Sequence, residues 1–204
     1  MILAMKIRPL FALLLAFACA AHAQDSATDF RVTSAFPKYV TADLEFRDPS
    51  GVKWPNFFYG KPANETGQIA LDPAKPAAAF TLLCDKMAQD KGDQSRKVLG
   101  ELPQPLTATL TITAMGALEP VAKSKDKTTH TAELAGTLEI AGRKIPVKAP
   151  TNFRRHDGKG DEKQAALMLY GQFSVRAADL GLKAPGEVAV RFALTAYPQD
   201  ASRK

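Results

Sequence analysis

The residue types that most often do chemistry in proteins are sparse in this chain. Neither His130 nor His156 has a cysteine or a carboxylate at the spacing of a metal-binding motif. His130 lies among lysine and threonine residues, and His156 lies in an Arg-Arg-His-Asp-Gly stretch that is typical of a hairpin tip. We therefore expect both histidines to be surface residues, and we predict no metal site.

Other catalytic motifs are also missing from the sequence. It contains no G-x-S-x-G elbow, no H-E-x-x-H helix, no P-loop and no dinucleotide-binding glycine pattern. Asp85, Asp90 and Asp93 alternate with lysines, which favours a charged connection between strands over the paired carboxylates of a glycosidase. The sequence predicts a protein that is not an enzyme.

The first 23 residues have the pattern of a secretory signal peptide. Lys6 and Arg8 precede an apolar run over residues 10–18, and Ala21-His22-Ala23 ends it with the small-x-small order of a cleavage site. The run is shorter than the roughly 20 apolar residues that span a bilayer. We expect cleavage after Ala23 and a location in the periplasm.

The remaining chain, residues 24–204, is expected to form one domain. No Gly/Ser linker, repeat or low-complexity run divides it. Cys19 lacks the residues that precede a lipidated cysteine, so we do not expect a lipoprotein. Cys84 is the only cysteine left after processing, which excludes an intramolecular disulfide. Packing must therefore supply the stability of the domain.

The formal charge of the whole chain is +6, and the densest basic stretches are residues 123–127 and 154–163. Acidic residues interrupt both stretches, no aromatic residues interleave with the arginines and lysines, and we expect both to be loops. Nucleic acid is therefore not an expected partner. Transient contact with an anionic membrane surface stays open.

Strict alternation of apolar and polar residues dominates the rest of the chain. In residues 106–114, leucine, isoleucine and alanine alternate with four threonines, which predicts a strand with Ala114 on its apolar face. Residues 30–36 and 40–46 alternate on either side of Pro37-Lys38, which predicts a hairpin. We expect roughly eight to ten antiparallel strands, enough to close a barrel.

Three segments depart from this pattern. Residues 85–102 predict a short helical crossing that ends near Gly100. Residues 52–59 hold the only tryptophan and are expected to form an edge strand or an aromatic loop at a barrel rim. The strand 166–175 is apolar on both faces, so a helix, the segment 47–64 or a second copy of the chain is expected to cover it. A homodimer therefore stays open.

Three stretches occur in an order that resembles the YceI-like family: residues 136–150 (GTLEIAGRKIPVKAP), 170–182 (YGQFSVRAADLGL) and 186–196 (GEVAVRFALTA). Residues 66–73 are similar to an earlier strand of the family. The resemblance implies an all-β fold, a single extended antiparallel lipocalin-like barrel in the periplasm. It also implies that the barrel binds a long apolar molecule and does not catalyse a reaction.

We therefore expect a periplasmic lipid-binding protein that holds a polyisoprenoid, a prenyl quinone or a fatty-acyl chain. No cofactor is expected unless the bound isoprenoid or quinone-like lipid serves as one. The alternative is a barrel filled by its own side chains that acts as a protein-interaction or stress-response module without ligand. The predicted lumen residues are Phe36, Leu44, Phe46, Phe80, Leu82, Leu110, Ile112, Leu138, Ile140, Leu169, Phe173, Phe192 and Leu194, and the predicted rim residues are Trp54, Phe57 and Phe58.

Overall fold

A computed structural model describes residues 29–32, 42–47, 49, 53–54, 67–84, 102, 106–122, 124–125, 127–157 and 165–199. The elements are β1 (Asp29–Val32), β2 (Ala42–Arg47), β3 (Lys53–Trp54), β4 (Gly67–Ala70), β5 (Ala77–Cys84), β6 (Ala108–Met115), β7 (Glu119–Pro120), β8 (Thr128–Ile140), β9 (Arg143–Asp157), β10 (Ala165–Arg176), the 3₁₀ turn η1 (Ala177–Leu180) and β11 (Glu187–Pro198). The predicted signal peptide lies outside the described residues, and so does the helical crossing except for Leu102.

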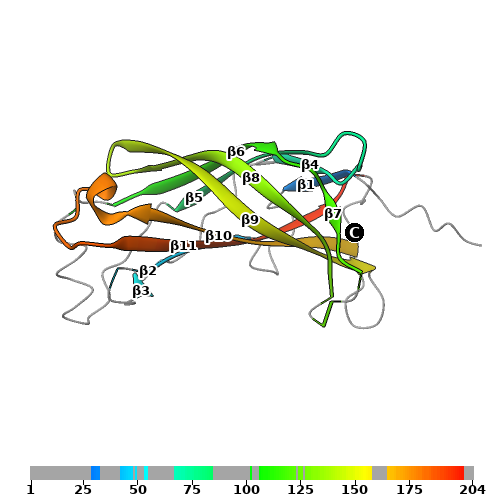
Figure 1. Cartoon of the computed structure of the whole chain (residues 1–204). Helices are drawn as coiled ribbons and strands as arrows, with labels where there is room; N and C mark the ends of the chain where they lie inside the picture. Colours follow the sequence, from blue (N-terminus) through cyan, green and yellow to red (C-terminus); the bar gives the residue numbers. More distant parts are fainter. Residues whose placement is uncertain are drawn as a thin grey trace, which may run out of the picture.

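The strands close into an antiparallel barrel (Figure 1). β1, β4, β5, β6, β8, β9, β10 and β11 are neighbours in that order, and β11 returns to β1 through the pairs Phe30–Pro198 and Arg31–Tyr197. The ring therefore has eight strands, within the roughly eight to ten that the alternation predicted. β2 and β3 extend the sheet beside β11, and β7 pairs with β8.

The expected hairpin between residues 30–36 and 40–46 is wrong. β1 and β2 both pair antiparallel with β11, through Arg31–Tyr197 and Ala42–Leu194, so they run in the same direction one after the other. Alternation fixes which face of a strand points inward, but it does not fix which strand is its hydrogen-bonded neighbour. Phe30, Val32, Leu44 and Phe46 are accordingly all buried.

The turn between β8 and β9 is the hairpin that the sequence predicted. Ala141 has a φ of 50° and Gly142 a φ of 75°. Positive φ at both central residues is the geometry of the type I′ turn, which matches the right-handed twist of the flanking strands. Ala141 adopts this conformation although it carries a Cβ, which makes the position a strained one.

One prediction for β6 is corrected by a bulge. Ile112 pairs with Gly136, whereas Ala114 pairs with Ala135, so Thr113 is an extra residue in the ladder. An extra residue reverses the alternation that follows it. Ala114, expected to face inward, is exposed, while Met115 packs against the core.

One end of the barrel is closed by the segment after β10. Ala177, Leu180 and Leu182 are buried and belong to the same core cluster as the barrel wall. The Arg143 Nη1 atom donates a hydrogen bond to the Asp179 carbonyl oxygen at 3.3 Å, which ties η1 to the start of β9. We call this the capped end, and Figure 1 shows η1 beside the tip of β8 and β9.

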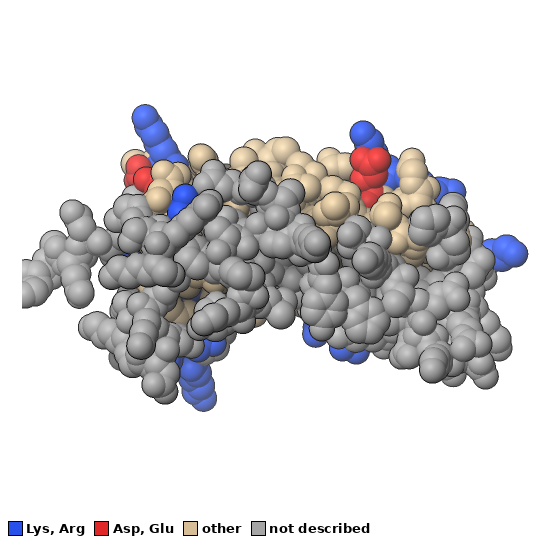
Figure 2. All heavy atoms as spheres, turned by 180° about the vertical axis from the view of Figure 1, so that it is seen from behind, with Lys and Arg blue, Asp and Glu red and all other residues tan. Residues whose placement is uncertain are grey.

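Charged side chains are scattered over the described part of the face in Figure 2 and form no single patch there. Ion pairs such as Lys148–Glu133 at 3.0 Å and Lys144–Glu139 at 3.5 Å link exposed side chains. Exposed pairs of this kind contribute about 0–1 kcal/mol each. Among the described residues, no helix has the length and apolar character that a membrane crossing requires.

Candidate binding site in the barrel interior

The described residues of the predicted lumen lie on the inner face. Each is exposed by 8% or less, with Phe173 the most exposed of the set. Their burial confirms the predicted strand faces, since residues at alternate positions point to the same side of a sheet. Phe36, Phe57 and Phe58 lie outside the described residues, and for Trp54 only the backbone in β3 is described.

Phe80 and Phe192 meet inside the barrel, from β5 and β11. Their ring centroids are 6.3 Å apart with the planes at 57°, a tilted contact that is favourable for aromatic pairs. Gly171 makes room for this arrangement, because a Cβ at that position would lie 2.2 Å from the Phe192 Cζ atom. The middle of the interior is thus lined by two aromatic rings and a bare backbone.

The inner face of β9 carries one buried polar side chain in this apolar wall. Thr151 is 2% exposed, and its Oγ1 atom donates to the Ala149 carbonyl oxygen at 2.8 Å. A buried hydroxyl with a backbone partner leaves no unsatisfied donor. The side chain therefore behaves as part of the wall.

The end opposite η1 has a different inner surface, which we call the basic end. Arg155 pairs with Leu167, and Phe153 pairs with Leu169, across β9 and β10. Directly paired residues lie on the same face, so Arg155 points inward like the fully buried Leu167. Its Cζ atom lies 5.6 Å from the centroid of the buried Phe30 ring, a cation–π contact.

His130 lies beside Arg155 on the neighbouring strand. A bulge between Thr128 and His130 shifts the ladder, and His130 then pairs with the inward residue Phe153. His130 is partly buried and partly exposed, and its side chain lies on the inner face of the barrel. Burial lowers the pKa of its imidazole below the usual 6.5, and the positive charge of Arg155 lowers that pKa further.

The hydrogen bonds around His130 fix its tautomer. The Thr129 hydroxyl donates to the Phe153 carbonyl oxygen at 3.1 Å, so its oxygen accepts from the His130 Nδ1 atom, also at 3.1 Å. In the neutral ring the Nε2 atom then carries the lone pair. The Thr129 hydroxyl thus links the imidazole ring to the backbone of β9 at Phe153, two residues before Arg155.

The basic end was missed in the sequence because residues 154–163 were expected to form a loop. β9 instead continues to Asp157. The signal was present in the alternation Val147, Ala149, Thr151, Phe153, all buried, which places Arg155 next on the inner face. The polar Arg-Arg-His-Asp-Gly stretch favoured a loop and led to the wrong prediction for residues 154–157.

The outer face holds a separate hollow of about 470 Å³ over β9, β10, β11 and β2. Its outward-facing residues include Glu45, Asn152, Tyr170 and Arg191. The sequence predicted that a helix, the segment 47–64 or a second copy of the chain covers one face of the strand 166–175. Met168 is partly buried, while Tyr170 is 40% exposed and donates from its hydroxyl to the Met168 sulfur at 3.7 Å.

No group of three or more histidine, cysteine, aspartate or glutamate residues that could hold a metal ion occurs among the described ranges. Among the described residues, the interior offers apolar contacts along its wall and the side chains of Arg155 and His130 at one end.

Comparisons with known proteins add the following. No protein-family profile and no curated protein matches this chain. It is similar to the crystal structure of Burkholderia cenocepacia BcnA, at 15% identity and a TM-score of 0.44, with 82% of this chain and 94% of that chain covered. Because the likeness is this low, a function has to be argued from the residues of this chain. Membership of the YceI-like family stays a prediction.

Proposed function

We propose that this protein binds a long apolar molecule inside its barrel and does not catalyse a reaction. The observation that carries the proposal is the closed ring of strands whose inner face, apart from Thr151, is aliphatic and aromatic from the capped end up to Phe30 and Phe153. A prenyl or acyl chain gains about 25 cal/mol for each Å² of apolar surface that it buries. Such a wall binds it without specific polar contacts.

The ligand classes proposed are a polyisoprenoid, a prenyl quinone or a fatty-acyl chain. We expect affinity to grow with chain length, by up to about 0.8 kcal/mol for each added buried methylene, until the interior is full. Titration of delipidated protein with alcohols of increasing chain length, followed by calorimetry, measures this slope. Affinity that is flat in chain length would contradict the proposal.

Native mass spectrometry of protein purified from its own host is the companion experiment. A carrier retains a lipid, which adds a discrete mass, whereas a filled barrel does not. The same spectrum reports the oligomeric state.

The contact between Phe80 and Phe192 specifically favours the alternative, a barrel filled by its own side chains that acts as an interaction module. Ala149→Leu separates the two functions because Ala149 is inward and fully buried. In an open interior the larger side chain blocks the ligand at little cost in stability. In a filled core it overpacks and destabilises the fold by about 1–3 kcal/mol.

Ala189→Leu is the matched control, since Ala189 lies between the inward residues Val188 and Val190 and so faces outward. We expect it to leave both ligand binding and stability within about 0.5 kcal/mol of the wild type.

We further propose that the protein acts in the periplasm after removal of residues 1–23. Support comes from the order of charged, apolar and small residues in that segment. N-terminal sequencing of the exported protein is expected to begin at Gln24, and a lipidated N-terminus at Cys19 would contradict the proposal.

A further inference from the structure

We propose that the basic end of the barrel binds the acidic head group, a carboxylate or a phosphate, of an amphiphile whose chain lies in the interior. The inference rests on the proposed function and names the class of ligand. It adds a polar contact at one end to the apolar contacts of the proposed function.

The position of Arg155 matches the junction of a head group and a chain. Its level in the barrel is set by the pairs Arg155–Leu167 and Leu167–Ala196, across β9, β10 and β11. The next inward level is Phe153–Leu169, both fully buried. Successive inward residues of a strand are about 6.6 Å apart. Arg155 therefore lies one inward step beyond Phe153 and Leu169, toward the basic end.

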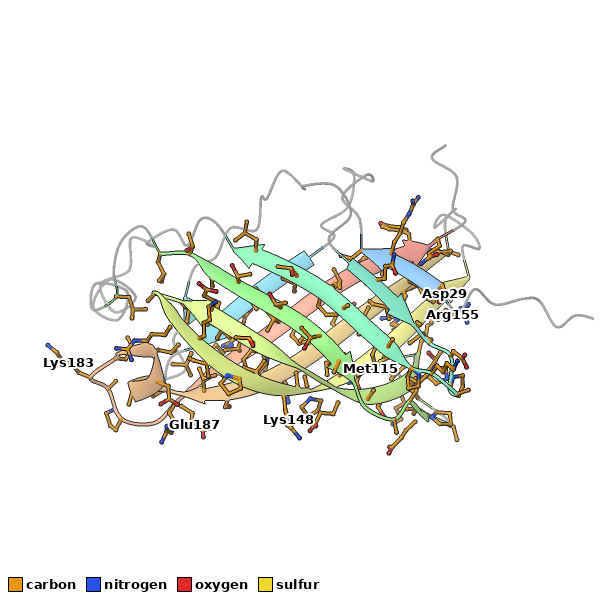
Figure 3. All side chains as sticks on the ribbon, turned by 90° about the horizontal axis from the view of Figure 1, so that it is seen from above. Asp29, Met115, Lys148, Arg155, Lys183 and Glu187 are labelled. Carbon is orange, nitrogen blue, oxygen red and sulfur yellow. The ribbon has the colours of Figure 1, made fainter. Side chains whose placement is uncertain are left out.

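The two polar side chains of the basic end remain partly accessible to solvent. Arg155 and His130 are partly exposed, in contrast to Leu167 and Ala196, which are fully buried. Figure 3 shows Arg155 at the same end as Asp29, with Lys183 and Glu187 at the opposite end. A polar head group at Arg155 can thus stay hydrated while its chain is buried.

Charged side chains described at this end lie on both faces of the barrel wall. Arg155 points inward, whereas the carboxylates of Asp29, Glu119 and Glu133 are exposed and belong to the outer surface. His130 also points inward, because it pairs with the inward residue Phe153. A guanidinium on the inner face attracts an anionic head group.

Arginine suits the proposed head groups because its planar guanidinium matches the geometry of carboxylate and phosphate oxygens. The contact with Phe30 holds the Cζ atom over the ring and so restricts the side chain. His130 is held in turn by the Thr129 hydroxyl. Both side chains are thus positioned before a ligand arrives.

The test compares dodecanoic acid, dodecyl phosphate and dodecanol by calorimetry on the delipidated full chain, near neutral pH. We expect the two acids to bind at least about tenfold more tightly than the alcohol, because a charge-assisted hydrogen bond to Arg155 contributes about that factor in affinity. Equal affinities of acid and alcohol would overturn the inference and leave the proposed function intact. Binding of none of the three would refute the proposed function itself.

The variant Arg155→Gln is expected to lose the preference for the acids and to keep the affinity for dodecanol, which also shows that it folds. Arg154→Gln is the matched control, because it removes the same charge one residue away on the other face of β9. The control is expected to keep the preference. A preference that survives Arg155→Gln, or is lost equally in both variants, would overturn the inference.

Acetate and inorganic phosphate distinguish a head-group site from a site for small free anions. We expect both to bind much more weakly than dodecanoic acid and dodecyl phosphate. Comparable affinity would overturn the assignment to an amphiphile. If Arg155→Gln does not fold, the ratio of acid to alcohol affinity is measured in the wild type and in Arg155→Lys instead. Arg155→Lys retains the charge and is expected to retain the preference for the acids, and equal affinities of acid and alcohol in the wild type would overturn the inference.

Discussion

The two ends of the barrel differ in what they place inside it. At the capped end, Ala177, Leu180 and Leu182 join the core, so the interior closes with apolar side chains. At the basic end, the strands β8 and β9 continue with His130 and Arg155 on the inner face. The interior is thus closed by apolar side chains at one end and carries the charge of Arg155 at the other, so its two ends are chemically different.

The largest effect is expected from placing a charge in the capped end. Leu180→Lys introduces an ammonium at a position that is 1% exposed and is expected to cost several kcal/mol of unfolding free energy, measured by urea denaturation. Ala178→Lys is the control on the same turn, because Ala178 is exposed. Equal losses in the two variants would show that η1 does not close the barrel.

A smaller effect is expected between the two ends, at Gly171. Gly171→Ala forces the Phe192 ring aside, because the new Cβ would lie 2.2 Å from its Cζ atom. We expect a loss of about 1–3 kcal/mol in thermal or urea unfolding. Adding Phe192→Leu should recover part of that loss, and additive losses would contradict the contact.

The turn that borders the capped end offers a stabilising change. Ala141 has a φ of 50°, a conformation that asparagine tolerates better than alanine. Ala141→Asn is expected to raise the unfolding free energy by about 0.5–1 kcal/mol. A loss of stability on urea denaturation would argue against a type I′ turn.

The smallest effect concerns the titration of His130. Its pKa is lowered first by burial and then by Arg155, so the neutral imidazole is the favoured form in the folded protein. The unfolded chain then binds more protons, and the small stability contribution is present above pH 6.5 and lost as the pH falls through the folded pKa. NMR titration should find a pKa below 6.5 that Arg155→Gln raises in part. A pKa at or above 6.5 would contradict this.

The barrel and its inner wall were predictable from the sequence because each depends on a local repeat of two residues. Leu110, Leu138 and Phe192 could be assigned to the inner face without knowledge of their neighbours. The bulge at Thr113 was not predictable, since it arises from a register shift between β6 and β8 that the composition of β6 does not reveal.

The pairing of the strands and the residues of the basic end could be assigned only from the structure. Whether β1 pairs with β2 or with β11 is decided by long-range closure of the ring, which leaves no trace in the residues 30–46. The alternation of residues 147–153 points to Arg155 as the next inward residue, but only the structure shows that β9 continues to Asp157. Polar composition predicts a loop, and here strand pairing with β10 overrides that preference.

The most direct test of the account is the orientation of a bound acid inside the barrel. Intermolecular NOEs between dodecanoic acid and protein with labelled alanine and leucine methyl groups report it. We predict contacts from the methylenes next to the carboxylate to Leu167 and Ala132, and contacts from the terminal methyl to wall residues nearer the capped end, such as Leu110 and Leu138. Contacts confined to the outward methyl of Ala193, or a carboxylate end next to Leu180, would contradict the account.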